Sequence, residues 1–298
     1  MIHSAFSTIT IEEIEQTFKN VINEKIISCK DVSKGVEQQV TIIETVSEKY
    51  IFKLPKKKEM NFREVMACNL LKNKIPVPEI IAYTDDFVIE KYIPGNDLNE
   101  IKLDKINAEK VYNEVGNILA VIHSYHTNGY GIIMPNETGK HTDLKSFSLY
   151  NEINLKRLQN AYLSSGEIKK VIAFIENKQF YFDNKQSVLL HYDFVDTNLR
   201  INNKKVSGVI DFGDLSAGCS ALDFAWIFIY HYGTPNFDWI VKGYENEIDI
   251  DEIKFFVVCN LIWFITYEDK RNKLAVQKKL NMLNDIVNYK SSFSFLKW

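Results

Sequence analysis

The most informative part of the chain reads His191-Tyr192-Asp193-Phe194-Val195-Asp196-Thr197-Asn198, and Ile210-Asp211-Phe212-Gly213-Asp214 follows it. Short β segments joined by polar turns are expected in this region, which places both motifs on loops at strand ends. An aspartate five residues before an asparagine, with another aspartate after the next strand, suits phosphoryl transfer. That reaction needs a carboxylate aimed at the attacking hydroxyl and oxygen ligands that hold Mg²⁺ against the phosphates. Asp193 fits the first role, and Asn198 and Asp211 fit the second.

The residues before these loops predict a small α+β lobe over residues 1–93. Apolar side chains recur at helical spacing in two stretches, and runs rich in β-formers lie between and after them. The expected elements are a helix at Thr10–Val21, an antiparallel hairpin of Val40–Val46 and Tyr50–Leu54, a helix at Met60–Lys72 and a strand at Phe87–Ile93.

Residues 94–298 predict a larger, mainly helical lobe that carries the catalytic loop and the substrate pocket. Helices are expected at Lys105–Tyr125, Phe147–Leu163, Glu167–Asn177, Leu222–Tyr232, Ile253–Tyr267 and Leu274–Tyr289. Short β segments are expected at Val188–His191, Leu199–Ile201 and Val206–Ile210. The fold class that follows is α+β, with an antiparallel sheet in the first lobe and helices in the second.

The motif H-x-D-x-x-x-x-N followed by I-D-F-G resembles the aminoglycoside phosphotransferase and choline kinase group, a branch of the two-lobed protein-kinase-like fold. Further pieces of the family pattern occur upstream in the expected order, and the resemblance covers roughly residues 30–230. These pieces are Ile51-Phe52-Lys53, Asn61-Phe62-Arg63-Glu64, Phe87 to Gly95, and Leu119-Ala120-Val121-Ile122-His123. The order of the whole set, more than any single motif, makes the resemblance specific.

On the nucleotide side, the resemblance implies roles for four residues. Lys53 would contact the nucleotide phosphates, and Glu64 would hold Lys53 in place. The backbone of Glu90 and Tyr92 would hydrogen-bond the edge of the base. ATP or GTP is the implied co-substrate, and Mg²⁺ is the implied cofactor.

On the catalytic side, the resemblance makes Asp193 the base and makes Asn198 and Asp211 metal ligands. Asp223 falls where the family keeps an aspartate that supports the catalytic loop. The chain departs from the pattern at Tyr192, a position where glycine is common. It departs again between Ser33 and Gln38, where the nucleotide loop contains a single glycine.

The composition indicates which partners and which cellular location to expect. The net charge of −3 comes from 36 basic and 39 acidic residues with no basic cluster, so nucleic acid is not expected as a partner. The four cysteines are far apart and lack zinc-site spacing, and the N-terminus lacks the pattern of a signal peptide. A cytoplasmic protein without a membrane span is expected. The lack of a heptad repeat favours a monomer.

The acceptor is expected to be a small molecule, because Asp223 follows Asp211 by only twelve positions, which leaves no room for a protein-kinase activation segment. An aminoglycoside, as a polycation, needs carboxylates around its pocket. Glu268 and Asp269 are the candidate substrate ligands, since they follow an apolar helix. A second acidic group is interpreted instead as a solvated turn; it comprises Glu245, Glu247, Asp249, Asp251 and Glu252.

Two alternatives stay open at this point. A metabolic kinase of a small alcohol such as choline or homoserine would use more aromatic or neutral side chains, and Tyr230, Tyr232, Trp239 and Trp263 are available. A kinase-like protein that binds nucleotide without turnover belongs to a different class. The presence of the complete catalytic set argues against it.

Overall fold

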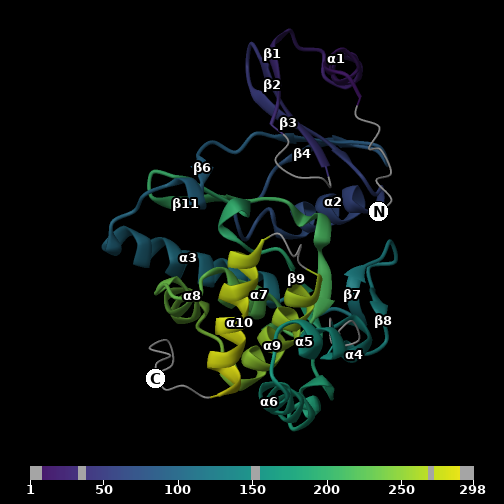
Figure 1. The fold of residues 1–298 in the computed structure, drawn as a ribbon. Helices are drawn as coiled ribbons and strands as arrows, with labels where there is room; N and C mark the ends of the chain where they lie inside the picture. Colours follow the sequence, from purple (N-terminus) through teal and green to yellow (C-terminus); the bar gives the residue numbers. More distant parts are fainter. Residues whose placement is uncertain (1–8, 33–37, 149–154, 268–271, 289–298) are drawn as a thin grey trace. The chain divides into compact units, whose positions relative to one another are not determined.

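A computed structural model describes residues 9–32, 38–148, 155–267 and 272–288 (Figure 1). The chain divides into two compact units, of which the first joins Met1–Lys102 to Asp196–Leu215. The second joins Leu103–Val195 to Ser216–Trp298. The sequence predicted a boundary after residue 93, with everything later in the second lobe. The compact units divide the chain differently, because strands from the 196–215 segment pair with the end of the N-terminal segment.

Unit 1 is built on a five-stranded antiparallel sheet in the order β1-β2-β3-β5-β4. The strands are β1 (Ile26–Asp31), β2 (Gln38–Thr45), β3 (Lys49–Pro55), β4 (Ile80–Tyr83) and β5 (Val88–Lys91). The expected hairpin is β2–β3, and the expected later strand is β5. The two edge strands, β1 and β4, were not expected. Exposed side chains such as Ile27 and Tyr83 interrupt the apolar pattern there.

Two helices cover opposite faces of this sheet. Helix α1 (Ile11–Val21) starts at a capping box in which Thr10 and Glu13 exchange hydrogen bonds, and it buries Ile14 and Phe18. These two side chains join a core cluster with Ile43, Tyr50, Phe52 and Ile89. Because side chains alternate along a strand, Lys53 lies on the other face, toward helix α2 (Glu59–Leu71). Both helices were expected, and both are confirmed.

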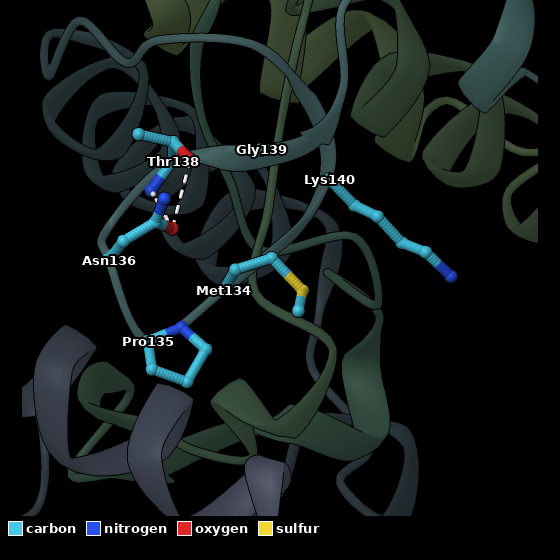
Figure 2. A pocket seen from close by; sticks show the side chains of 6 residues that line it. All are labelled: Met134, Pro135, Asn136, Thr138, Gly139 and Lys140. Carbon is cyan, nitrogen blue, oxygen red and sulfur yellow. Dashed lines mark hydrogen bonds between the residues drawn. The ribbon is translucent and has the colours of Figure 1, made fainter.

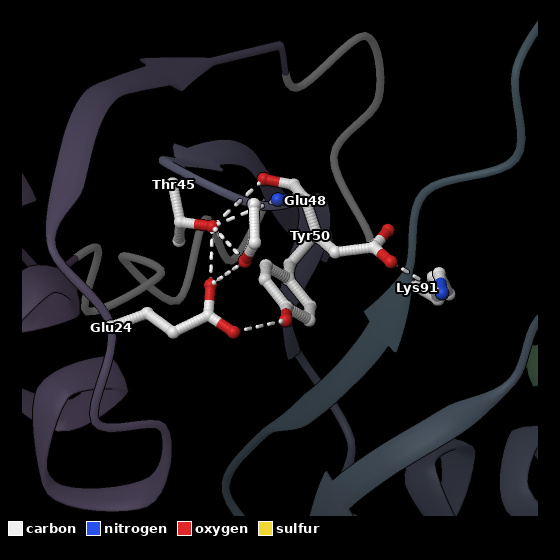
Figure 3. Close-up of polar contacts among 6 residues, drawn as sticks. Glu24, Thr45, Glu48, Tyr50 and Lys91 are labelled. Carbon is white, nitrogen blue, oxygen red and sulfur yellow. Dashed lines mark hydrogen bonds and ion pairs between the residues drawn. The ribbon is translucent and has the colours of Figure 1, made fainter.

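The segment between α1 and β1 is tied to the β2–β3 turn by Glu24 (Figure 3). Its carboxylate accepts hydrogen bonds from Thr45, from Ser47 at 2.6 Å and from Tyr50 at 3.2 Å. These donors, Ser47 first, hold the pKa of Glu24 below its usual value. Glu48, in the same turn, also forms an ion pair with Lys91 of β5 at 2.8 Å.

A second, three-stranded sheet completes unit 1, in the order β11-β10-β6. Its strands are β6 (Asn96–Asp97), β10 (Leu199–Asn202) and β11 (Lys205–Val209). The guanidinium of Arg200 binds the Asp97 carboxylate and the Gly95 carbonyl, and it donates to the Tyr92 hydroxyl at 3.0 Å. This arginine therefore joins the 196–215 segment to the end of the N-terminal segment. The 3-10 turns η1 (Leu98–Glu100), η4 (Asp196–Asn198) and η5 (Phe212–Asp214) also belong to this unit.

Unit 2 is mainly helical and includes a four-stranded antiparallel sheet in the order β8-β7-β12-β9. Its helices are α3 (Lys105–His123), α4 (Leu144–Phe147), α5 (Leu155–Ala161), α6 (Ser165–Glu176), α7 (Ala221–Tyr230), α8 (Asn236–Tyr244), α9 (Ile250–Tyr267) and α10 (Lys273–Val287), with η3 at Gln179–Phe182. Its strands are β7 (Tyr130–Ile133), β8 (Gly139–His141), β9 (Val188–Leu190) and β12 (Ser216–Gly218). In Figure 1, α7, α9 and α10 lie side by side, and their contacts agree.

Helices α3 and α8 cross at close range through two glycines. A Cβ added at Gly116 would lie 2.1 Å from the carbonyl oxygen of Ile240, and one at Gly243 would lie 1.9 Å from that of Asn113. Both obstacles are backbone atoms, so neither can move without moving a helix. The small residues at these positions set the distance between the two helices.

Unit 2 differs from the sequence expectation in several places. The helix expected over Phe147–Leu163 does not begin at Phe147, because α4 ends there and Ser148 adopts extended backbone. Helix α5 forms the later part of the expected range, and residues 149–154 lie outside the described residues. Helix α8 and the strands β7, β8 and β12 were not expected; the strands are three or four residues long, too short for a period-2 pattern. Within the described ranges, no helix combines the length and apolarity that a membrane crossing requires.

Candidate active site

Lys53 is held between two buried carboxylates within unit 1. Its ammonium nitrogen lies 3.0 Å from Oε1 of Glu64 on α2 and 3.1 Å from Oε1 of Glu90 on β5. The Lys53 side chain is 8% exposed, and each carboxylate side chain is 3% exposed. The pairing of Lys53 with Glu64, which the resemblance implied, is present in the structure. The second carboxylate, Glu90, was not foreseen as a partner of the lysine.

The charges in this cluster do not balance. Burial alone would lower the pKa of Lys53, but the carboxylates of Glu64, Glu90 and Asp211 together raise that pKa above its usual value. Burial, with the nearby charge of Glu64, raises the pKa of Glu90 to about 7. The other oxygen of Glu90, Oε2, has no hydrogen-bond partner among the described residues. One lysine therefore stabilises two buried carboxylates incompletely.

Helix α2 also holds the Asp211-Phe212-Gly213 turn. The second oxygen of Glu64 accepts a hydrogen bond from the Phe212 amide at 2.8 Å, and Arg63 donates to the Gly213 carbonyl at 2.5 Å. Asp211 itself has left-handed backbone, with φ of 66°. A non-glycine residue in this conformation costs about 1–2 kcal/mol, and contacts from α2 stabilise the residues that follow it. Glu64 thus connects the lysine to the aspartate turn.

Asn198 and Asp211 lie at the same end of the β10–β11 hairpin. The Ile210 amide donates to the Asn198 carbonyl at 3.0 Å, and Leu199 is opposite Val209 in the ladder. Oδ1 of Asp211 accepts a hydrogen bond from the side-chain amide Nε2 of Gln38 at 2.8 Å. The described residues contain no group of three or more His, Cys, Asp or Glu side chains suited to a metal. Two side-chain oxygen donors fit Mg²⁺, which usually takes one or two protein ligands and completes its shell with water and phosphate.

The catalytic loop belongs to unit 2 up to Val195, and Asp223 on α7 organises its backbone. Asp223 is buried, and its two oxygens accept hydrogen bonds from the amides of His191 at 3.1 Å and Tyr192 at 2.9 Å. Tyr192 has left-handed backbone with φ of 67°. The amide of Asp193 donates to Nδ1 of His191 at 3.3 Å, and the Asp193 side chain is exposed. The Asp223 carboxylate therefore holds the backbone immediately before Asp193.

Two buried residues extend this network behind Asp223. Nε2 of His123, at the end of α3, lies 3.1 Å from Oδ2 of Asp223. Nδ1 of the same ring lies 2.9 Å from the hydroxyl of Tyr244. Because an ionised carboxylate can only accept hydrogen bonds, the proton on Nε2 of His123 points to Asp223. Asp223 therefore accepts three hydrogen bonds, from His123 and from the amides of His191 and Tyr192. His123 is therefore part of a buried hydrogen-bond network behind the loop that contains Asp193.

Glu90 and Tyr92, which are expected to bind the nucleotide base, already make contacts within unit 1. The Tyr92 amide donates to the Lys49 carbonyl at 2.9 Å, and the Arg200 guanidinium lies 5.5 Å from the Tyr92 ring centroid. A contact from the Tyr92 backbone to a base would therefore use its carbonyl. Glu90 lies in β5 between β3 and β4, opposite Ile51 and Ile80. Its side chain turns to Lys53, a contact that depends on the pairing of β5 with β3.

The expected substrate ligands Glu268 and Asp269 lie outside the described residues. The other acidic group borders a hollow of about 860 Å³ that also includes Tyr181 and Lys254. Two of its carboxylates form ion pairs. Asp251 pairs with Lys178 and Lys254, and Glu252 pairs with Lys185 at 2.9 Å. Asp251 and Glu252 lie in the first turn of α9 and are half-buried, so the solvated turn expected from the sequence is limited to the residues before that helix.

A second hollow, of about 440 Å³, lies on the hairpin that joins β7 to β8 (Figure 2). Its lining comes from residues 134–140, and Asn136 accepts a hydrogen bond from the Thr138 hydroxyl at 2.9 Å. Lys140 is the only titratable side chain in that lining. The hollow therefore contains no member of the phosphoryl-transfer set.

The family model described as "Phosphotransferase enzyme family" matches residues 28–248. A probable aminoglycoside 3′-phosphotransferase of Lactococcus lactis subsp. lactis (strain IL1403) is 26% identical over 262 residues, which cover 85% of this chain and 96% of that protein. The matched region includes every described residue of the proposed nucleotide, metal and catalytic set.

Solved structures show the same fold at low identity. Aminoglycoside phosphotransferase APH(4)-Ia superposes with a TM-score of 0.71 at 15% identity, covering 94% of this chain and 99% of that one. The ternary complex of APH(2″)-IIa with streptomycin and ATP gives 0.63 at 19% identity, with the same coverage. The kinase-like α+β fold and the resemblance inferred from the motifs are both confirmed. The extent of the family match shows that this chain belongs to the phosphotransferase enzyme family.

Proposed function

We propose that this phosphotransferase moves the γ-phosphate of ATP or GTP to a hydroxyl of an aminoglycoside. The observation that carries the nucleotide half is the buried Lys53–Glu64 pair, whose glutamate also binds the amide after Asp211. Such a pair beside an aspartate turn suits the binding of phosphates. The acceptor half is supported by the relative from Lactococcus lactis, whose described activity is on aminoglycosides.

In the proposed reaction, Asp193 accepts the proton of the acceptor hydroxyl as that oxygen forms a bond to the γ-phosphorus. The bond between the γ-phosphorus and the bridging oxygen breaks, and the nucleoside diphosphate leaves. Lys53 neutralises charge on the phosphates, and Glu64 keeps its ammonium in position. Asn198 and Asp211 would hold Mg²⁺, which when bound neutralises the negative charge of the phosphates.

The support for Asp193 comes from its loop. Its carboxylate is exposed, while the backbone on its N-terminal side is fixed by the buried Asp223. A fixed backbone beneath an accessible carboxylate suits a base that must meet an incoming hydroxyl. Action on a nucleoside triphosphate also fits the cytoplasmic location expected from the sequence. The monomeric state remains part of the proposal, and light scattering would contradict it with a mass of twice 34.7 kDa.

The test measures release of nucleoside diphosphate with Mg²⁺ and either ATP or GTP. The acceptors are kanamycin, gentamicin, streptomycin and hygromycin B, with choline and homoserine as metabolite controls. We expect turnover that depends on an aminoglycoside and falls at least about a thousand-fold in Asp193→Ala. Turnover with only choline or homoserine would replace the aminoglycoside by a metabolite. Nucleotide binding without turnover on any acceptor would contradict a kinase.

A further inference from the structure

A row of partly exposed aromatic side chains adjoins the catalytic loop in unit 2. Tyr192 is its link to the loop, and its ring centroid lies 5.0 Å from that of Phe147 and 6.3 Å from that of Trp226. The row continues from Trp226 to Phe264 at 5.2 Å and to Trp263 at a further 5.3 Å. We call these five residues the aromatic row. Large apolar rings that remain partly exposed together are typical of a binding surface.

Tyr192 occupies a backbone conformation that favours glycine. Its φ of 67° is stabilised by the bond from its amide to Asp223, and this bond would form with any residue at the position except proline. The backbone of the loop therefore does not require a tyrosine side chain. A bulky residue held in a strained conformation next to the proposed base indicates a function for its ring.

The chemistry of the row indicates the kind of ligand. Aromatic faces pack against the C–H faces of saturated rings and attract ammonium groups. Within the row itself, the Lys279 ammonium lies 4.1 Å from the Phe264 ring centroid, so an ammonium group already occupies one ring face. A hydroxyl that reaches Asp193 brings its molecule beside Tyr192, because adjacent Cα atoms are about 3.8 Å apart.

We propose that the aromatic row is the acceptor-binding surface, and that it binds a saturated ring carrying ammonium groups through Tyr192 and Trp226. Tyr192 then helps to determine which acceptor is used, and the nucleotide is bound independently of it. This inference rests on the proposed phosphotransfer and adds the surface that recognises the acceptor. It requires effects on acceptor affinity that nucleotide affinity does not share.

The experiment compares Tyr192→Gly, Tyr192→Phe and Trp226→Leu, with Phe180→Leu as the control. Phe180 is an exposed aromatic residue of η3 whose ring packs against that of Tyr181, outside the row. Tyr192→Gly removes the ring and relieves the strained backbone, so it should fold at least as well as the parent protein. We expect its KM for kanamycin to rise about ten-fold with the KM for nucleotide unchanged. Tyr192→Phe keeps the ring and should recover most of the affinity.

Tryptophan fluorescence gives a readout that does not depend on turnover. Kanamycin titrated without nucleotide should quench the emission of the parent protein, and Trp226→Leu should lose most of that change. Quenching without turnover on any acceptor would support the row and contradict only the proposed reaction. Turnover with a kanamycin KM within two-fold of the parent value in both Tyr192→Gly and Trp226→Leu would overturn the inference and leave the reaction intact. Equal rises in both KM values, or an equal effect of Phe180→Leu, would also overturn it.

Discussion

Replacement of Glu64 by glutamine tests the organisation of the Lys53 cluster most directly. The two carboxylate oxygens of Glu64 accept from Lys53 at 3.0 Å and from the Phe212 amide at 2.8 Å. Glutamine has nearly the same shape but only one acceptor oxygen, so its NH₂ group must face one of these donors. The variant therefore leaves a buried donor unsatisfied without opening a cavity.

The loss of stability expected for Glu64→Gln depends on Glu90. Breaking a buried ion pair costs about 3–5 kcal/mol when the remaining charge has no partner. Lys53 retains Glu90 at 3.1 Å, and loss of the Glu64 charge removes one cause that raises the pKa of Glu90. Glu90 would then ionise and pair with the lysine. The expected loss of stability is therefore only that of an unsatisfied buried donor, about 1–3 kcal/mol.

Urea unfolding would measure the stability, and steady-state kinetics would measure the KM for nucleotide and kcat. Because Lys53 would shift toward Glu90, kcat/KM should fall by roughly ten- to a hundred-fold, with the nucleotide KM raised. Glu59→Gln is the matched control, since Glu59 is an exposed glutamate on the same helix. A Glu64→Gln protein that matches Glu59→Gln in both stability and nucleotide KM would refute the reasoning.

Three further predictions address other parts of the structure. The folded-state pKa of Glu90, about 7, lies above its ordinary 4.5, so the contribution of Glu90 to stability should be greatest below pH 4.5 and fall by on the order of 3 kcal/mol up to pH 7; urea unfolding of the parent protein and of Glu90→Gln at several pH values should differ by this decrease, and parallel pH profiles would contradict it. Asp223→Asn leaves a buried donor unsatisfied, so stability should fall by about 2 kcal/mol. We also expect kcat to fall by a larger factor than the nucleotide KM changes, and an unchanged kcat would contradict a positioning role for Asp223. Gly116→Ala pushes α3 from α8 and should cost about 1–3 kcal/mol by thermal unfolding, whereas Gly166→Ala, with open space around its Cβ, should be neutral or stabilising.

The sequence alone predicted most of the long helices and the proposed catalytic set. The apolar residues predicted α1, α2, α3, α6, α7, α9 and α10 nearly at their observed bounds. Helix α1 buries a stripe at helical spacing, whereas α9 is recognised as a long apolar run that is buried on all sides from Phe255 to Ile262. The order of Lys53, Glu64, Asp193, Asn198 and Asp211 indicated a phosphotransferase before any contact was known. Each of these residue types follows from the needs of phosphate and metal chemistry, which are local.

Only the tertiary structure decided which side chains share a charge or a hydrogen bond. Glu90 forms an ion pair with Lys53 because β3 pairs with β5. The two residues are 37 positions apart in the sequence, and no local pattern specifies this contact. The same holds for Asp223, whose three donors come from α3 and from the catalytic loop. Short edge strands and the two-glycine crossing of α3 and α8 also depend on neighbours distant in sequence. Periodicity records which face of an element is buried, whereas the partner on that face is set by how the chain packs.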